Sequence, residues 1–301
     1  MRNYLSGMIR LVLLEFCHRA PSIKPNVLLS YALLDNDLPH FIGKFRSLMN
    51  SLILDSGVFS IQKEGSRFTA DELFLQFKTF AAYSDGNFDL IFNFDRHFGL
   101  DSYDANLEYQ LDLEAAGIPV VPVVHNIYHG DVEKIIARGL PAHKTVAIGQ
   151  CEGRTVLDNV RPAVMALYDA GARIHFFGSN EFNIMANLPI WSCDATSWSQ
   201  YTGYGVVLYW NSKSNKLDKT ERIHFPKFQD AKTPSGGQYY GTYGYLRDFE
   251  EYLEANLSLT VSDLLGENDE LYRSVANMLY YCLLEKTISE HQKALGFEVP
   301  E

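Results

Sequence analysis

Short apolar runs alternate with amphipathic stretches along most of the chain. The runs are rich in β-branched and aromatic residues and are bounded by Gly, Asp, Asn or Pro, which is typical of buried strands. Eight strands are predicted in this way, over residues 27–33, 52–54, 90–94, 120–124, 145–148, 174–177, 190–193 and 205–209.

The stretches between these runs have the periodicity of amphipathic helices. The segment 70–83 follows Thr69 and has Glu72 three residues after that threonine, which is the pattern of a capping box. Further helices are predicted over residues 103–116, 131–138 and 155–170. Strand–helix alternation repeated eight times predicts a parallel sheet, and eight strands close a barrel. The expected fold is therefore an α/β (β/α)8 TIM barrel, with a doubly wound open sheet as the competing fold.

The pattern changes at Gly241, after which helices follow one another without strands. They are predicted over residues 246–257, 261–265 and 270–295. We therefore expect residues 1–240 to form the catalytic barrel and residues 241–301 to form a helical C-terminal extension packed on it. The apolar segment 11–17 is too short to span a membrane and contains Glu15, so it is interpreted as a buried element.

The formal net charge of -11 excludes a protein that coats nucleic acid non-specifically. An enzyme that engages a single nucleotide needs only a local basic patch. Residues 211–232 form a polar excursion with six Lys or Arg against three acids, a local reversal of sign. Its side chains Lys213, Lys216, Lys219 and Arg222 are candidates for contacts with a nucleic-acid backbone, and a solvated hairpin is the alternative.

The four cysteines, Cys17, Cys151, Cys193 and Cys282, form no CxxC or CxC pair. The sequence therefore predicts neither a disulfide framework nor a cysteine-rich zinc site, and a reducing cytoplasm is the expected compartment. No other metal site is predicted.

Polar side chains directly follow several of the predicted strands, among them Asp55, Asp95, His125 and Asp194. Active sites of (β/α)8 barrels lie at the carboxyl ends of the strands, so three carboxylates and one histidine are expected to meet at one rim. The pKa values of neighbouring desolvated carboxyl groups move apart, so that one group is ionised while another holds a proton. This arrangement suits a nucleophile and an acid/base that act at a sugar carbon.

Each of these residues also has a purely structural interpretation. Asp55 and Asp194 are suited to capping the helices that follow them, and Asp95 is suited to an ion pair with the neighbouring Arg96. His125 taken alone is more typical of a hydrogen-bonded core histidine. Only their joint placement at successive strand ends favours chemistry.

The segment Asp-Ser-Gly-Val-Phe-Ser at 55–60 resembles the Asp-Ser-Gly-Gly-Tyr/Phe-Gln signature of the tRNA-guanine transglycosylases. Five further segments resemble motifs of that family in the same order, namely Phe-Asn-Phe-Asp at 92–95, Val-Pro-Val-Val-His at 121–125, Val-Ala-Ile-Gly-Gln at 146–150, Arg-Ile-His-Phe-Phe-Gly at 173–178 and Trp-Ser-Cys-Asp at 191–194. The resemblance covers residues 50–200 in outline.

The chain also departs from the family pattern. His125 stands where the family has a glutamine, Gln150 replaces the second glycine of a Gly-Gly pair, and Ala195 begins the segment that replaces Pro-Thr-Arg. The family's cysteine and histidine zinc motif is missing from the sequence. These differences fall where tRNA would be held. They are more similar to the DNA-directed branch, the DpdA-type DNA 7-deazaguanine transglycosylases of phages and bacteria.

The resemblance implies that guanine in DNA is replaced with a 7-deazaguanine derivative through a covalent aspartyl–glycosyl intermediate. It implies that Asp194 is the nucleophile and Asp55 the acid/base. The base-binding residues that it implies are Asp95, His125, Gly149, Gln150, Ser56, Gly57, Phe59 and Phe177. It implies neither a metal nor another cofactor.

The expected partners are DNA, with tRNA as the alternative, and the free 7-deazaguanine base. A homodimer is left open, no membrane association is expected, and the resemblance implies the cytoplasm of a bacterium or of a phage-infected host. Two other functions stay open, a non-catalytic subunit that binds base or nucleic acid in such an enzyme and a retaining glycoside hydrolase. Intact Asp55 and Asp194 argue against the first, and the segment 55–60 argues against the second.

Overall fold

The computed structural model describes residues 1–33, 38–59, 69–84, 86–99, 102–128, 130–226 and 232–299. The chain forms two compact units. The barrel unit comprises Met1–Ser6, Asn26–Ala195 and Ile288–Glu301, and the second unit comprises Gly7–Pro25 and Thr196–Thr287. The boundary therefore does not follow the division expected at residue 240.

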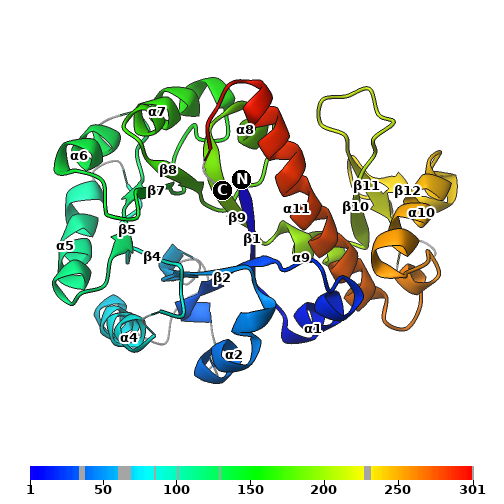
Figure 1. Cartoon of the computed structure of the whole chain (residues 1–301), viewed down its shortest axis with the longest axis horizontal. Coiled ribbons are helices and arrows are strands. Elements are labelled where there is room, and N and C mark those ends of the chain that lie inside the picture. The colour runs from blue at the N-terminus through cyan, green and yellow to red at the C-terminus, as the bar shows by residue number, and fades with distance from the viewer. Residues whose placement is uncertain are drawn as a thin grey trace. The chain divides into compact units, whose positions relative to one another are not determined.

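The barrel unit contains one parallel sheet in the order β5-β4-β3-β2-β1-β9-β8-β7-β6 (Figure 1). Its strands are β1 (Arg2–Ser6), β2 (Asn26–Ser30), β3 (Ser51–Asp55), β4 (Leu90–Phe92), β5 (Val120–Val121), β6 (Val123–Val124), β7 (Thr145–Ile148), β8 (Arg173–Phe176) and β9 (Ile190–Ala195). The expected α/β class and TIM-barrel-like fold are confirmed.

The sheet closes through the segment that contains β5 and β6. Pro122 separates these two short strands because it has no N–H to donate to the ladder. On one side Asn93 N donates to Val121 O, and on the other Ala147 N donates to Pro122 O. One chain segment thus pairs with both β4 and β7, and the two halves occupy a single strand position of the barrel.

The prediction that all eight strands belong to the barrel is wrong for one of them. The run at 205–209 is β10 (Val206–Trp210), which lies in the second unit in a separate three-stranded sheet. The barrel position belongs instead to β1, which pairs in parallel with β2 and β9. The sequence pattern missed β1 because its only apolar residues are Tyr4 and Leu5, whereas its burial comes from strands on both sides. The segment 211–232 therefore does not follow a barrel strand.

Helices follow most of the barrel strands and surround the sheet in Figure 1. They are α2 (Leu38–Phe45), α4 (Ala70–Tyr83), α5 (Ser102–Ala115), α6 (Asp131–Arg138), α7 (Leu157–Asp169) and α8 (Phe182–Asn187), with 3-10 turns at η1 (Tyr31–Leu33) and η2 (Arg46–Leu48). The capping box of α4 is confirmed, because Thr69 Oγ1 accepts from Glu72 N at 3.2 Å and Glu72 Oε2 accepts from Thr69 N at 2.8 Å.

Apolar side chains fill the interior of the barrel. They come from most of its strands and form one cluster of Tyr4, Leu28, Ile53, Leu90, Phe92, Val121, Val123, Ala147 and Trp191. Burial of each large apolar side chain stabilises the fold by roughly 1.5–3 kcal/mol. Because the interior is packed, polar chemistry is confined to the ends of the barrel.

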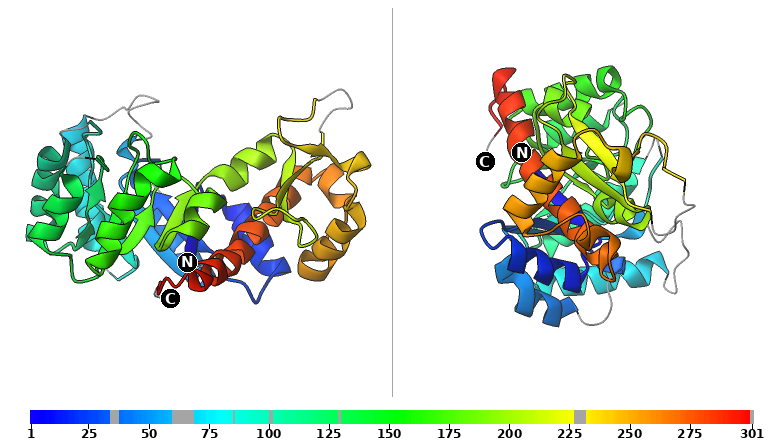
Figure 2. Two further views of the ribbon diagram at one scale, coloured as in Figure 1. Left: turned by 90° about the horizontal axis from the view of Figure 1, so that it is seen from above. Right: turned by 90° about the vertical axis from the view of Figure 1, so that its right-hand side faces the viewer.

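The second unit is built around its own sheet, in which β10 pairs antiparallel with β11 (Thr220–His224) and β11 pairs parallel with β12 (Gln238–Tyr239). Its helical segments are α1 (Arg10–Arg19), α9 (Ser197–Gly203), η3 (Tyr240–Thr242), α10 (Leu246–Leu257), η4 (Asp263–Leu265) and α11 (Asp269–Ala294) up to Thr287. The sheet lies beside α10, where Tyr209 contacts Phe249 (Figure 2). The predicted segment 11–17 lies within α1. Across the described ranges, no helix is long and apolar enough to cross a membrane.

A buried asparagine connects three elements of the second unit. Asn277 on α11 accepts from Leu208 N through Oδ1, and its Nδ2 donates to Trp198 O and Val206 O. Each of these bonds satisfies a backbone group that would be costly to bury unpaired. The amide of Asn277 thus holds α9, β10 and α11 together.

Candidate active site

Asp194 lies near the end of β9 with its side chain 9% exposed. Its Oδ1 accepts from Gly178 N at 2.8 Å and its Oδ2 accepts from Ser6 Oγ at 2.6 Å. His175 Nε2 lies 3.4 Å from Oδ1. With a donor at each oxygen, the carboxylate has one defined orientation. The sequence did not point to Ser6, which ends the overlooked strand β1.

His175 is fully buried between aromatic rings on the inner side of the rim. Its ring centroid lies 4.7 Å from those of both Phe92 and Phe177. Its Nδ1 is 2.8 Å from Ser192 Oγ, so the second ring nitrogen is turned toward Asp194. Phe177 meets the ring of His175 edge-on, also contacts Phe92 at 4.5 Å, and is only partly buried.

Asp55 ends β3, and its Oδ2 accepts from Gly57 N at 3.0 Å. Gly57 has a φ of +76°, and a Cβ there would lie 3.1 Å from the side chain of Ala32, so only glycine fits this turn. Burial, together with the negative charges of Asp194 and Asp95, raises the pKa of Asp55 to about 7. At neutral pH this carboxyl is therefore poised between its protonated and ionised forms, as a proton shuttle requires.

Asp95 follows β4 and is engaged at both oxygens. Asn93 Nδ2 donates to its Oδ1 at 2.8 Å, and His125 Nε2 lies 3.0 Å from its Oδ2. Burial by itself lowers the pKa of His125, but the charge and hydrogen bond of Asp95 outweigh burial and raise it above its ordinary value. Asp131 helps to fix the backbone of His125, because its Oδ2 accepts from His125 N at 2.9 Å. His125 is thus a partner of Asp95 and not an isolated core histidine.

Aromatic side chains border the carboxylates. Phe98 meets the ring of His125 edge-on at 5.3 Å, and Phe59 contacts Phe98 at the same centroid distance. The loop that carries Phe98 is held by Asn106, whose Oδ1 accepts from the backbone N–H groups of Arg96 and His97. Phe59 was expected at the site from the sequence, whereas Phe98 was not.

The ends of β7 and β8 complete the rim. A Cβ on Gly149 would lie 2.9 Å from Val123 Cγ1 and 3.0 Å from His125 Cε1, so a side chain here would displace the histidine ring. Gln150 is exposed, and its Oε1 accepts from the buried Arg154 at 2.6 Å. Ser56 is buried and its carbonyl accepts from Ala32 N, which makes it part of the turn after β3. Arg154 was overlooked because nothing in its local sequence distinguishes it from a surface arginine.

The basic side chains expected to hold a nucleic-acid backbone belong to the second unit of the chain. Lys213 Nζ forms an exposed ion pair with Asp248 at 2.6 Å, and Lys219 Nζ donates to Ser212 O at 2.9 Å. Arg222 lies 5.2 Å over the ring of Tyr201. Lys216, Lys213 and Arg222 are all exposed on the β10–β11 hairpin.

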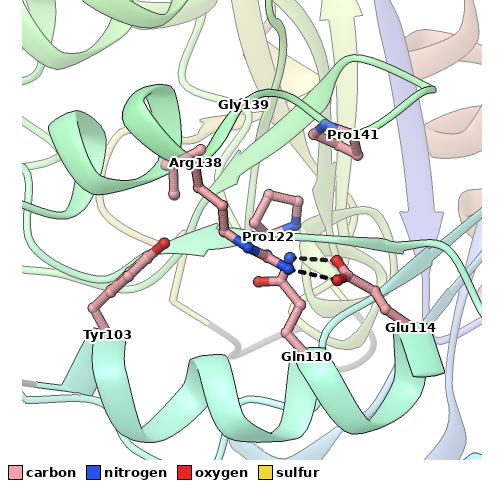
Figure 3. A pocket seen from close by; sticks show the side chains of 8 residues that line it. Tyr103, Gln110, Glu114, Pro122, Arg138, Gly139 and Pro141 are labelled. Atoms are coloured by element: carbon pink, nitrogen blue, oxygen red, sulfur yellow. Dashed lines mark hydrogen bonds and ion pairs between the residues drawn. The ribbon is translucent and has the colours of Figure 1, made fainter.

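A cavity of about 220 Å³ lies away from the carboxylates, between α5 and α6 on the flank of the barrel (Figure 3). Its lining residues are Tyr103, Gln110, Glu114, Pro122, Ile135, Arg138, Gly139 and Pro141. Glu114 forms a 2.5 Å ion pair with Arg138 and also accepts from Gln110 Nε2. The polar groups of Gln110, Glu114 and Arg138 are thus partners of one another.

In the parts of the chain that the structure describes, no three His, Cys, Asp or Glu side chains are grouped so that they could hold a metal ion. Comparisons with protein-family models, with curated proteins and with solved structures found no match. The site is therefore interpreted from its own geometry. That geometry is a TIM-barrel-like rim with one oriented carboxylate, one carboxyl of raised pKa and one carboxylate paired with a histidine.

Proposed function

We propose that this protein is a base-exchange transglycosylase that replaces guanine in DNA with a 7-deazaguanine derivative. The observation that carries the proposal is the meeting of three carboxyl groups at the ends of β3, β4 and β9, where burial and the charges of Asp194 and Asp95 raise the pKa of Asp55. Base exchange at a sugar carbon needs a nucleophile that is oriented and a second group that can give and take back a proton near neutral pH. Asp194 and Asp55 meet these two requirements.

In the first step, an oxygen of Asp194 attacks C1′ of the target nucleotide while the bond from C1′ to guanine N9 breaks. Protonated Asp55 transfers its proton to the departing guanine, which leaves as the neutral base. In the second step, ionised Asp55 removes the proton from N9 of the incoming 7-deazaguanine, and this nitrogen attacks C1′. The ester bond to Asp194 breaks, so both carboxyl groups return to their starting states.

The base would lie between the aromatic side chains and the polar rim. Phe59 and Phe177 are partly exposed and suited to stacking on a base that has left the duplex. Asp95 would accept from the N1–H and exocyclic amine of guanine through the lone pairs that Asn93 and His125 leave open. Gly149 and Gln150 would face the carbonyl edge of the base.

DNA is favoured over tRNA because the chain lacks the zinc motif and the Pro-Thr-Arg segment of the tRNA enzymes that it resembles. The experiment is an exchange assay with radiolabelled guanine and 7-deazaguanine, run in parallel on DNA, on tRNA and on a free oligosaccharide. We expect label to enter DNA only. Label in tRNA would support the tRNA enzyme, hydrolysis of the sugar would support a glycoside hydrolase, and absence of every reaction would contradict the proposal.

The lysines of the β10–β11 hairpin are expected to contact phosphates. The ion pair of Lys213 with Asp248 is of the surface type, worth about 0–1 kcal/mol, so a phosphate readily replaces Asp248 as the partner of Lys213. Replacing Lys213, Lys216 and Lys219 with Ser should weaken binding to all DNA sequences equally. The slope of log affinity against log salt should fall by roughly 2–3 units, since each lost contact accounts for 0.7–0.9.

The control replaces Lys78 and Lys134 with Ser, because these lysines form similar exposed ion pairs on helices of the barrel unit. The control should change the salt slope little. If both sets of variants bind DNA with the salt dependence of the unaltered protein, the hairpin is only a solvated surface.

A further inference from the structure

Arg154 is a buried cation at the rim of the barrel, 4% exposed, and it was not among the residues that the sequence singled out. Its Nη1 donates to the carbonyl oxygens of Gly149, at 3.3 Å, and of Phe177. Its Nη2 donates to Gln150 Oε1 at 2.6 Å. All three acceptors are neutral oxygens at the ends of β7 and β8, so the positive charge acts on the polar groups of the rim.

The turn that brings Arg154 to this place depends on a glycine. Gly153 has a φ of +76°, and a Cβ there would lie 1.8 Å from Tyr128 Oη. A residue with a side chain would therefore be strained and would have to displace the side chain of Tyr128. The chain folds back at Gly153 and places the guanidinium over the ring of Phe176, 5.3 Å from its centroid. The position of Arg154 is thus set by the backbone and by packing.

One peptide group connects Arg154 to the carboxylate of Asp194. The guanidinium donates to the carbonyl of Phe177, and the N–H of the same peptide belongs to Gly178 and donates to Asp194 Oδ1 at 2.8 Å. Hydrogen bonds in such a chain polarise and strengthen one another. The cation therefore strengthens the donor that orients Asp194 without touching this residue.

Arg154 also determines which end of the Gln150 amide faces outward. A guanidinium has donors only, whereas a glutamine amide has one acceptor oxygen and two N–H donors. The atom bound to Arg154 must therefore be Oε1, and Nε2 is left as a donor on an exposed side chain. A group that presents N–H recognises a carbonyl oxygen and rejects an amino group at the same position.

We propose that Arg154 is a positioning residue of the reaction, which orients Asp194 through the 177–178 peptide and fixes Gln150 as a hydrogen-bond donor toward the base. The inference rests on the proposed base exchange. It goes beyond that proposal by naming the hydrogen-bond donor that selects the incoming base. The selected bases carry a carbonyl group at the edge that faces Gln150, as guanine and 7-deazaguanines do. A purine with an amino group there, such as 2,6-diaminopurine, is rejected.

The test measures incorporation of guanine and of 2,6-diaminopurine into DNA, as kcat/KM for each base. In Arg154→Met the amide of Gln150 is free to turn over and present its oxygen to an amino group, so the preference for guanine should fall about tenfold. The kcat for guanine should also fall, because the Asp194 donor is weakened. Arg154→Lys, which keeps the charge without the forked geometry, should restore kcat only in part.

Gln150→Glu is the second variant, and it separates the two roles. A carboxylate still accepts from Arg154, and Gln150 is exposed, so the fold and the Asp194 contacts should persist while the donor toward the base is lost. We expect the preference for guanine to fall as far as in Arg154→Met, with a smaller loss in kcat. A uniform loss of rate for both bases in Arg154→Met, with unchanged preference, would overturn the inference and leave Arg154 a structural residue.

The orientation of the amide can be checked without any base. The side-chain amide of Gln150 should give a resolved NMR signal in the unaltered protein and a signal typical of a free glutamine in Arg154→Met. A free signal in the unaltered protein would contradict the positioning of Gln150 even if exchange occurs. If the Gln150 amide signal is resolved but the protein exchanges no base, the proposed function is contradicted. The inference about base choice is then contradicted as well.

Discussion

Asp194→Asn is expected to lower base exchange by a factor on the order of 10⁴ or more, because an amide cannot form the glycosyl ester. The substitution is nearly isosteric. An asparagine Oδ1 can still accept from Gly178 N, and its Nδ2 can donate to Ser6 Oγ in a bond of reversed direction, so both partners of the carboxylate are retained. The thermal unfolding midpoint should therefore change little while the activity is lost.

Ser6→Ala is the matched control for this variant, since it removes one donor to Asp194 and keeps the carboxylate. Its loss of rate should be far smaller, about 10-fold, in line with one hydrogen bond worth about 1–2 kcal/mol. Mass spectrometry of the protein trapped on DNA should detect a covalent adduct at Asp194. An Asn variant with turnover close to that of the unaltered protein would remove Asp194 from the role of nucleophile.

Asp55→Asn is expected to lower the rate by about 10²–10⁴-fold, the range for loss of one general acid–base group. The rate of the unaltered protein should change with pH around 7, because burial and the charges of Asp194 and Asp95 raise the pKa of Asp55 to about 7. In the variant the part of this dependence that is due to Asp55 should disappear. The measurement is the pH profile of kcat for both proteins.

The same raised pKa has a consequence for stability that needs no substrate. A carboxyl with a folded-state pKa above its unfolded value favours folding while it is protonated, so its contribution is present below pH 4 and is lost as the pH rises through about 7. The loss is on the order of 4 kcal/mol. Asp55→Asn stays neutral, and its free energy of unfolding relative to the unaltered protein should therefore be higher at pH 8 than at pH 4.

Asp112→Asn provides the comparison, because Asp112 lies in an exposed ion pair with Lys78 on the outside of the barrel. Its difference in unfolding free energy from the unaltered protein should change little over the same pH range. If Asp55→Asn behaves like Asp112→Asn, Asp55 is not held in the field of Asp194 and Asp95, and the assignment of a proton shuttle loses its physical basis.

Much of the barrel could be predicted from local patterns. Seven of the eight predicted strands lie in its sheet. Runs of β-branched and aromatic residues between turn residues favour the strand conformation wherever they occur. The capping box at Thr69 and the helices α4, α6 and α10 were also predictable, since caps and helical periodicity depend on residues a few positions apart. The placement of Asp55, Asp95, His125 and Asp194 after strands was visible for the same reason.

The closure of the barrel depends on contacts between residues far apart in the chain. β1 is a barrel strand because β2 and β9 pair with it on both sides, and its own composition carries no such signal. β10 has the composition of a barrel strand, yet it pairs antiparallel with β11 in the second unit. Local sequence specifies that a segment is extended, whereas hydrogen bonding between distant segments specifies which sheet it joins.

The chemistry of the rim likewise arises from long-range contacts. Ser6 donates to Asp194 across 188 positions of sequence, and the pKa of Asp55 depends on Asp194 and Asp95, which belong to other strands. Arg154 resembles any surface arginine until the turn at Gly153 buries it. Residue types and their order are local properties of the sequence. Burial, the electrostatic effect of neighbouring charges and hydrogen-bond partners arise only once the strands are assembled.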